Sequence, residues 1–487
     1  MLSKTTYVNV GRSGTFNPSA NHRYDTKPED VDAIIELLRT NNQRELGLYF
    51  HGGLVKDTAG IQSAKIMNSK ITESGLHPIS FVWETGIFDV LREKLDKIGR
   101  KTLFKIIQRI IVRRLGDRIP LSKNREAIKE ITYSEIEFEL SKKTPFKNYV
   151  INDNYRVLED NNFQTEDEMV ITLEEDIKKD VLENPILIEG LDIGEVDDII
   201  YDNKYTLEKS MSRDAPFLGG FFWSIAKIVY NIILRFKRDN DHGFYATMIE
   251  EIFRRYYVAK IGASIWQEMK DKAKEMWKSN TGRSGNNLYA GTYLLTKLNE
   301  LGTIENPIII NLIGHSAGSI AICYLIKEVQ ENYPHIKVNN LVFLAPACRS
   351  ELFDEYVVQK TERFNEIRIF TMSDEYERKD TLIDGFSIVY PHSLLYFISG
   401  ILEDAGKNPD AHILGLERHV NWQKYMKHSH LKNINTYLND TQKNRLVLSV
   451  SKTNEVGLSS NAIDHGDFDD NPNTLTSIVH ILKNGLN

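Results

Sequence analysis

One serine in this chain stands at a bend that two glycines make possible. The stretch INLIGHSAGSIAICY (311–325) passes from an apolar strand-like run into an apolar helix-like run, and Ser316 lies at the junction between Gly314 and Gly318. So tight a turn strains the serine backbone, and the glycines keep neighbouring Cβ atoms from clashing. The turn also pushes the serine hydroxyl out of the sheet edge, beside the N-terminus of the next helix. The stretch therefore predicts a nucleophilic serine on a G-x-S-x-G turn.

This turn, in its strand-to-helix setting, resembles the nucleophile elbow of the α/β-hydrolase superfamily, in particular its lipase and esterase branch. The resemblance covers about residues 1–86 and 288–487. It implies an α/β-hydrolase fold, with a mostly parallel central sheet flanked by helices. It also implies a catalytic triad whose members follow one another along the chain as nucleophile, acid and histidine.

The acid of such a triad is expected just past the second strand after the serine. The segment EIRIFTMSDEYERKD (366–380) places Asp374 there, directly after an apolar strand. Three nearby carboxylates, Glu375, Asp380 and Asp384, compete with it for this role. We therefore expect Asp374 to hold the catalytic histidine in the correct tautomer and to stabilise its protonated form.

The histidine is expected after the last strand. His465 follows the apolar stretch NRLVLSVS (444–451) and precedes the C-terminal helical segment, and its neighbour Gly466 suits a loop that carries an imidazole over the sheet edge. His392 and His419 lie in the same half of the chain and compete with it. The chain order favours His465 as the base that accepts the serine proton.

A third feature points to stabilisation of an oxyanion. YFHGGLV (49–55) looks like the oxyanion loop of the resembled family, with His51, Gly52 and Gly53 directly after a strand. Glycines at this place let main-chain N–H groups approach a substrate closely. We expect Gly53, and also Gly52, to act together with the N–H of Ala317.

The elements needed to position these residues can be read from two alternating patterns. Short β-branched apolar runs predict buried parallel strands, and segments with helical periodicity lie between them. The expected strands are 46–53, 78–86, 307–316, 340–348, 366–374 and 444–451, and the expected helices are 58–75, 291–302, 317–333 and 471–485. Such alternation predicts an open parallel sheet with right-handed crossovers.

Residues 87–287 interrupt this alternation, and we interpret them as one large, mainly helical cap inserted between core segments 1–86 and 288–487. Two of its stretches have features of membrane-contacting helices. Residues 88–115 form a basic amphipathic pattern, and residues 217–236 are rich in aromatic side chains. The favoured interpretation is that both are packed helices, the first lying on the core with a solvated basic face, for which pairing with the acidic stretch 159–202 is an option.

Composition excludes several classes of partner and cofactor. The net charge of −7 argues against a nucleic-acid partner. His428 and His430 form too sparse a pair to predict a metal site, and no phosphate-binding glycine loop is present, so we expect no metal and no cofactor. The two cysteines, Cys323 and Cys348, stand in apolar contexts and are expected to be buried free thiols, as suits a reducing compartment.

The N-terminal residues lack a signal-peptide pattern, and no apolar run is long enough for a membrane span. A cytoplasmic protein is expected, with peripheral membrane contact through 88–115 or 217–236 as an option. The predicted function is cleavage of small-molecule carboxylic esters, with lipid-like or apolar acyl groups, through an acyl-enzyme. Two further functions stay open: a peptidase or amidase on the same scaffold, and a membrane- or protein-binding module that acts through the insertion.

Overall fold

The computed structural model describes most of the chain, with gaps concentrated in the region 84–215. The described residues are 2–17, 24–52, 57–83, 102–118, 121–122, 132–142, 145–146, 150–151, 165–189, 216–255, 258–382, 390–406 and 408–486.

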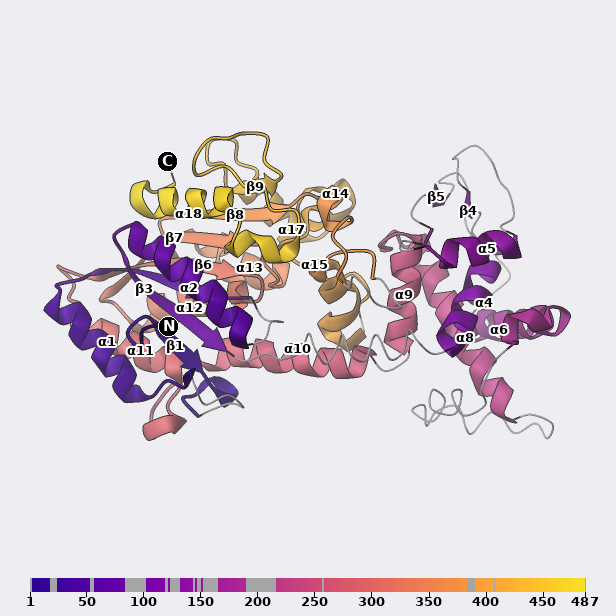
Figure 1. Cartoon of the computed structure of the whole chain (residues 1–487), viewed down its shortest axis with the longest axis horizontal. Coiled ribbons are helices and arrows are strands. Elements are labelled where there is room, and N and C mark those ends of the chain that lie inside the picture. Colours follow the sequence, from indigo (N-terminus) through magenta and orange to yellow (C-terminus); the bar gives the residue numbers. More distant parts are fainter. Residues whose placement is uncertain are drawn as a thin grey trace.

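Seven parallel strands form the central sheet, in the order β1-β3-β2-β6-β7-β8-β9 (Figure 1). Their bounds are β1 Tyr7–Val10, β2 Glu45–Phe50, β3 His77–Trp83, β6 Ile308–His315, β7 Ile336–Leu344, β8 Glu366–Met372 and β9 Leu446–Ser449. Most of their residues are buried, as expected for a parallel sheet covered on both faces. The prediction of an α/β protein with a parallel sheet is therefore confirmed.

Helices cover both faces of the sheet. One face carries α2 (Asp57–Glu73) and α18 (Pro472–Asn484), which contact each other. The other carries α1 (Pro28–Thr40), α11 (Ala290–Leu301), α12 (Gly318–Asn332) and α10 (Val258–Glu275), among which α1 contacts α11 and α10 contacts α12. The two groups lie on opposite faces because right-handed crossovers leave the neighbouring strands β2 and β6 in opposite directions.

This reversal of direction defines the place where a ligand is expected to bind. The chain leaves β2 toward β3 on one side and leaves β6 toward β7 on the other. In open α/β sheets, ligands bind outside the carboxyl ends of the strands where the strand order reverses. The residues that follow β2 and β6 are therefore the first place to look for a functional site.

Most of the described part of 87–287 forms a helical group that stands apart from the sheet (Figure 1). Helices α4 (Thr102–Arg118), α5 (Tyr133–Leu140), α6 (Glu166–Glu183) and α8 (Pro216–Lys237) pack on one another beside a short antiparallel pair, β4 (Leu121–Ser122) and β5 (Val150–Ile151). Helix α9 (Phe244–Arg255) connects this group to α10. Although α10 also lies within 87–287, it packs against α12 and so belongs to the layer that covers the sheet.

The apolar residues of α4 are buried rather than exposed. Leu103, Ile107 and Ile111 lie in the core, and the basic residues of the same helix contact acidic neighbours. Arg109 Nε lies 2.5 Å from Glu137, Arg113 Nε lies 3.0 Å from Asp180, and Arg114 pairs with Asp176. This arrangement agrees with the interpretation of a packed helix whose basic face meets the acidic stretch.

The apolar side chains of α8 that the structure describes, from residue 220 onward, are largely buried as well; they include Phe221, Phe222, Ile225, Ile228 and Val229. Within the described chain, no helix is both long enough and apolar enough to cross a membrane. Cys323 and Cys348 are free and buried, as predicted.

The remaining α-helices of the described chain are α13 (Ser350–Tyr356), α14 (Asp374–Glu377), α15 (Leu394–Phe397), α16 (Glu417–Asn421) and α17 (Ser429–Leu438). A π-helical turn spans Ile398–Leu402, and 3-10 turns span Arg12–Gly14, Pro185–Ile188, Gly285–Asn287, Val358–Arg363, Glu403–Gly406, Gln423–Tyr425 and His465–Asp469.

Close packing at the start of α12 leads to a prediction about stability. A Cβ atom on Gly318 would lie 2.2 Å from the main-chain oxygen of Phe50, so Gly318→Ala must push helix α12 away from β2. We expect this change to lower the free energy of unfolding by about 1–3 kcal/mol, as overpacking generally does. Urea unfolding followed by circular dichroism measures it. The control is Gly466→Ala, because a Cβ atom there meets nothing within 4 Å; equal stability of both variants would contradict the packing argument.

Candidate active site

The backbone of Ser316 is held in a strained conformation between β6 and α12. Its φ angle is 51°, in the left-handed region that costs non-glycine residues energy. Hydrogen bonds fix this turn against β7 and the segment after it. The Ser316 N–H donates to the oxygen of Leu344 at 2.8 Å, and its carbonyl oxygen accepts from the Ala347 N–H at 3.0 Å and from Ser319 Oγ at 2.6 Å. The turn also needs Gly314, where a Cβ atom would lie 2.6 Å from Ile322 Cδ1.

The fold brings His465 to this serine from 149 residues away. His465 Nε2 lies 3.0 Å from Ser316 Oγ, which is hydrogen-bond distance. If Nε2 accepts the hydroxyl proton, the ring carries its own proton on Nδ1. Among the described residues, Nδ1 is buried and has no hydrogen-bond partner. The predicted serine–histidine pair is therefore present, but its second ring nitrogen is not held by a carboxylate.

Asp374 does not orient His465, and this prediction is wrong. Its Oδ1 accepts the Tyr396 hydroxyl at 2.5 Å, and its Oδ2 pairs with Arg378 at 3.1 Å. Asp374 is the first residue of α14, so Arg378, four residues later, lies one helical turn away and draws the carboxylate away from the histidine.

The carboxylate that contacts His465 belongs to Asp380, which the sequence placed among the competitors of Asp374. Its Oδ2 accepts the main-chain N–H of His465 at 3.0 Å. Glu375 instead pairs with Lys379, and Asp384 lies outside the described residues. Asp380 is thus positioned beside the histidine, though its hydrogen bond goes to the backbone and not to the ring.

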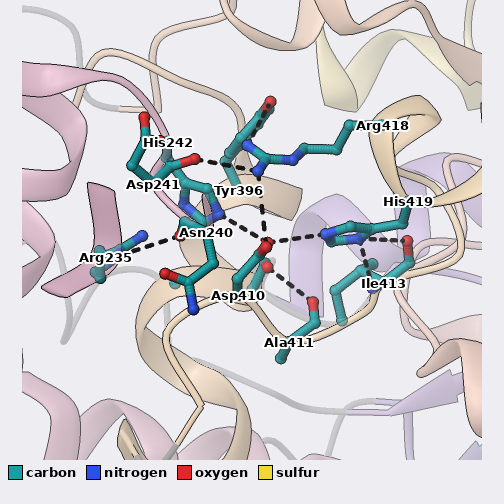
Figure 2. Close-up of polar contacts among 12 residues, drawn as sticks. Arg235, Asn240, Asp241, His242, Tyr396, Asp410, Ala411, Ile413, Arg418 and His419 are labelled. Atoms are coloured by element: carbon teal, nitrogen blue, oxygen red, sulfur yellow. Dashed lines mark hydrogen bonds and ion pairs between the residues drawn. The ribbon is translucent and has the colours of Figure 1, made fainter. Parts of the chain in front are cut away.

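The two competing histidines, His392 and His419, lie in different environments. His392 Nε2 contacts the main-chain oxygen of His242 at 2.7 Å. His419 Nε2 contacts Asp410 at 2.9 Å within a buried polar network that also includes His242 and Arg418 (Figure 2). Both rings are therefore engaged away from Ser316, which leaves His465 as the histidine that meets it.

A buried charge network lies beneath the serine–histidine pair. His315 Nδ1 contacts Asp469 Oδ2 at 3.1 Å, and its Nε2 contacts the main-chain oxygen of His465 at 3.0 Å. Tyr49 donates its hydroxyl to the same Asp469 oxygen at 2.7 Å. Burial alone lowers the pKa of His315, but the charge and hydrogen bond of Asp469 outweigh it, so the pKa is raised above 6.5. Since both ring nitrogens face acceptors, this arrangement favours the positive form of His315.

This network sets the protonation of the site. Burial, followed by the neighbouring positive charge of His315, lowers the pKa of His465 to about 3, and Asp469 opposes the shift only in part. His465 is therefore neutral at pH 7, the form that can accept a proton. Burial raises the pKa of Asp380 to about 7; the His465 N–H opposes this shift, and the charges of Asp464 and Asp467 add to it.

The residues expected to bind an oxyanion adjoin Ser316. Ala317 is the N-cap of α12. A Cβ atom on Gly52 would lie 3.3 Å from Ser316 Cβ, a contact tighter than usual, so Gly52 adjoins the serine closely. His51 fixes the strand end that carries Gly52: its ring stacks on Trp83 at 4.8 Å, and its Nε2 accepts the Trp83 N–H at 3.1 Å. Gly53 lies outside the described residues.

Both members of the serine–histidine pair are buried. Ser316 has 3 % of its surface exposed and His465 has 8 %.

Sequence reasoning missed Tyr49, His315 and Asp469. A signal for two of them was available, because His315 directly precedes the serine and Asp469 follows His465 by four residues, within one short turn. Nothing in the sequence marks Tyr49 as part of the site, because it resembles an ordinary strand residue.

The search for related proteins gives no further information. No family model, no curated protein and no solved structure matches this chain. The chemistry of the site therefore follows from the groups that it brings together. These are a serine hydroxyl beside a neutral imidazole, main-chain N–H groups, and a carboxyl group that ionises near pH 7.

The raised pKa of Asp380 predicts a pH profile. Ionised Asp380 adds to the stabilisation of an imidazolium that forms on His465, so phosphonylation of Ser316 by a fluorophosphonate should accelerate as the pH rises through about 7. Stopped-time labelling from about pH 5.5 to 8.5 measures this. Asp380→Asn should slow labelling on the order of 10²-fold at about pH 8 and remove the inflection.

Asp374→Asn is the matched control and should keep the wild-type profile. An inflection near pH 7 that persists in Asp380→Asn would assign it to another group.

Proposed function

We propose that this chain is a serine hydrolase of the α/β-hydrolase type that cleaves carboxylic esters through an acyl-enzyme. The observation that carries the proposal is the 3.0 Å contact between Ser316 Oγ and His465 Nε2. Its position supports the proposal further, because Ser316 follows β6 and Gly52 follows β2, the two strands between which the strand order reverses. Nucleophile, histidine and oxyanion donors occur in the chain order that the resembled family uses.

In the first half of the proposed reaction, Ser316 Oγ attacks the acyl carbon while its proton passes to His465 Nε2. The carbonyl oxygen becomes an oxyanion, which the N–H of Ala317 stabilises together with the glycine N–H groups after β2. The imidazolium then gives its proton to the departing alcohol oxygen, and the acyl group stays on Ser316. In the second half, His465 takes a proton from water while the water oxygen attacks the acyl carbon. The imidazolium then returns this proton to Ser316 Oγ as the bond between serine and the acyl group breaks, which releases the acid.

Charges beneath the site decide how easily the imidazolium forms. Asp469 favours it, because its anionic carboxylate raises the pKa of His465, whereas the neighbouring His315 disfavours it. Ionised Asp380 is the closest candidate for the missing partner of Nδ1, since it already contacts the backbone of the same residue. Asp380 is therefore proposed as the acid of the triad.

The substrate class follows from the same electrostatics. The ring nitrogen Nδ1 has no partner among the described residues, so the imidazolium is weakly stabilised. His465 is then a weak base toward the serine proton, which favours a substrate whose acyl carbon is already electrophilic, as that of an ester is compared with that of an amide. Two apolar segments that could face a lipid-like acyl group are packed into the interior: the described part of α8 lies in the helical group, and Leu395, Phe397 and Ile401 lie in the core. Preference for a long acyl chain stays a prediction.

Removing the nucleophile provides the direct test. Ser316→Ala should lower kcat for p-nitrophenyl acetate by roughly 10⁴–10⁶-fold and abolish fluorophosphonate labelling, while the circular dichroism spectrum stays unchanged. Mapping the labelled peptide of the wild-type protein should identify Ser316.

The control is Ser319→Ala, which removes a hydrogen bond to the Ser316 carbonyl from the same turn but leaves the nucleophile in place. It should retain labelling at the same residue. A Ser316→Ala variant within tenfold of the wild-type rate would refute the proposed function.

The choice between ester and amide is tested by paired substrates. We expect p-nitrophenyl esters to be cleaved on the order of 10²-fold or more faster than p-nitroanilides of the same acyl group, because a weakly basic His465 assists the attack of Ser316 poorly and an ester carbonyl is more electrophilic than an amide carbonyl. Esters with acyl chains of two to twelve carbons, assayed in parallel, report the acyl preference. Comparable rates on both classes would make the chain an amidase.

A further inference from the structure

Three side chains from distant parts of the sequence meet outside the candidate active site. Glu351 lies in α13, His412 lies in the loop before α16, and His430 lies in α17. His412 Nδ1 and His430 Nε2 are 3.0 Å apart, and Glu351 Oε1 lies 3.6 Å from the first and 3.5 Å from the second. One ligand atom from each residue thus forms a nearly equilateral triangle.

Two edges of this triangle, those from Glu351, match the edges of a metal coordination shell. A tetrahedral ion with bonds of about 2.0–2.2 Å to nitrogen and oxygen holds its ligand atoms about 3.3–3.6 Å apart. The third edge, 3.0 Å between the two histidine nitrogens, is hydrogen-bond distance, but Glu351 lies farther from both nitrogens than the usual hydrogen-bond range of about 2.7–3.2 Å. The position of Glu351 therefore fits a ligand of one ion shared with the two histidines, whose nitrogens would move slightly apart to bind it.

We propose that Glu351, His412 and His430 bind one Zn²⁺ ion, with water in the fourth position. Two imidazole nitrogens and one carboxylate oxygen are ligands that zinc commonly uses, and three protein ligands leave a fourth position open. The site was not predictable from the His428/His430 pair, because only His430 of that pair belongs to the triangle and its partners come from residues 351 and 412.

The surrounding structure holds the ligands in place. The Arg349 guanidinium donates two hydrogen bonds, of 3.0 and 2.9 Å, to the carboxylate of Glu351. Its Nη2 donates to the same Oε1 that faces the histidines, which is compatible with metal binding because a carboxylate oxygen has two lone pairs. A hydrogen bond to a metal-binding carboxylate is the outer-shell support that such sites usually have.

The loop that carries His412 is fixed on both sides. The Ser350 N–H donates to the carbonyl oxygen of His412 at 2.9 Å, which joins this loop to the start of α13. The next residue, Ile413, donates its N–H to His419 Nδ1 at 3.0 Å, at the edge of the Asp410 network (Figure 2). The ligands therefore need little rearrangement to bind an ion.

An ion can reach the site from solvent. The side chains of His412 and His430 are 10 % and 19 % exposed, and that of Glu351 is 43 % exposed. His412 also borders a cavity of about 470 Å³, together with His428. Bound zinc would connect α13, the loop at 412 and α17, and α13 follows the segment whose Ala347 N–H holds the Ser316 carbonyl.

Zinc binding is measured on the full chain, stripped with chelator and dialysed, by competition with a chromophoric zinc indicator. We expect one tight Zn²⁺ per chain. Glu351→Gln, His412→Asn and His430→Asn should each weaken binding at least about 100-fold, because loss of an outer-shell group alone costs about 10–100-fold. Thermal unfolding of the wild type, with and without Zn²⁺, should show a higher midpoint with the ion, and this rise should vanish in the variants.

His428→Asn is the matched control. Its ring lies 4.6 Å from that of His412, but it is not one of the three ligands, so binding should stay close to wild type. Circular dichroism of each variant without metal establishes that it is folded. Absence of tight binding in the wild type, unchanged binding in a His412→Asn/His430→Asn double variant, or equal weakening by His428→Asn would each overturn the proposed site.

Discussion

The crowded turn at Ser316 is the constraint on which the rest of the site depends. The start of α12 lies so close to β2 that residue 318 has no room for a side chain, and the serine itself adopts a φ of 51°. Such a conformation persists only where the surroundings over-determine it, and here β7, the segment after it and Ser319 supply four hydrogen bonds to the serine backbone. The same packing that fixes the turn brings the ends of β2 and β6 together. A helix N-terminus, a glycine loop and a hydroxyl therefore meet at one point.

Buried charge is the second organising principle, and it works through pairs. Asp469 is anionic beneath the site because His315 and Tyr49 surround its carboxylate, and its pKa falls to about 2 although burial alone would raise it. The Asp410 carboxylate is stabilised in a similar way. Two histidines and Arg418 contact it (Figure 2), and Tyr425 donates its hydroxyl to it. A buried charge without such partners would be far less stable. The Asp410 network joins His242, just before α9, to residues 410–425, so it also fixes the loop that carries His412.

The sequence indicated which residues meet in the site where their order along the chain decides it. It was misleading where the direction in which a side chain points decides it. Ser316 and His465 could be paired across 149 residues because strand–helix alternation limits where each can lie. Asp374 was wrong because its position after β8 said nothing of Arg378 and Tyr396, which turn its carboxylate away. The Glu351, His412 and His430 cluster was invisible for the same reason, since its members belong to three separate segments and none stands in a metal-binding motif. Helix α10 could not be separated from the insertion by periodicity alone, because its apolar face looks the same whether it packs on other inserted helices or on α12.

The direction of the Asp380 carboxylate leaves the ring nitrogen Nδ1 of His465 unpartnered and leaves uncompensated the burial that raises the pKa of Asp380. In this structure the carboxylate bonds to the backbone N–H and not to Nδ1, which has no partner among the described residues, so neither group gains from the charge of the other. If the carboxylate turned toward Nδ1, it would raise the pKa of His465 and lower that of Asp380, and each unit of such a shift is worth about 1.4 kcal/mol. In the proposed reaction that gain would arise only when the imidazolium forms. Stabilisation confined to the transition state accelerates a reaction, whereas the same contact present at rest would stabilise the starting state equally. Transfer of the serine proton to His465 would be the occasion for this rearrangement, so the attack and its stabilisation would be coupled.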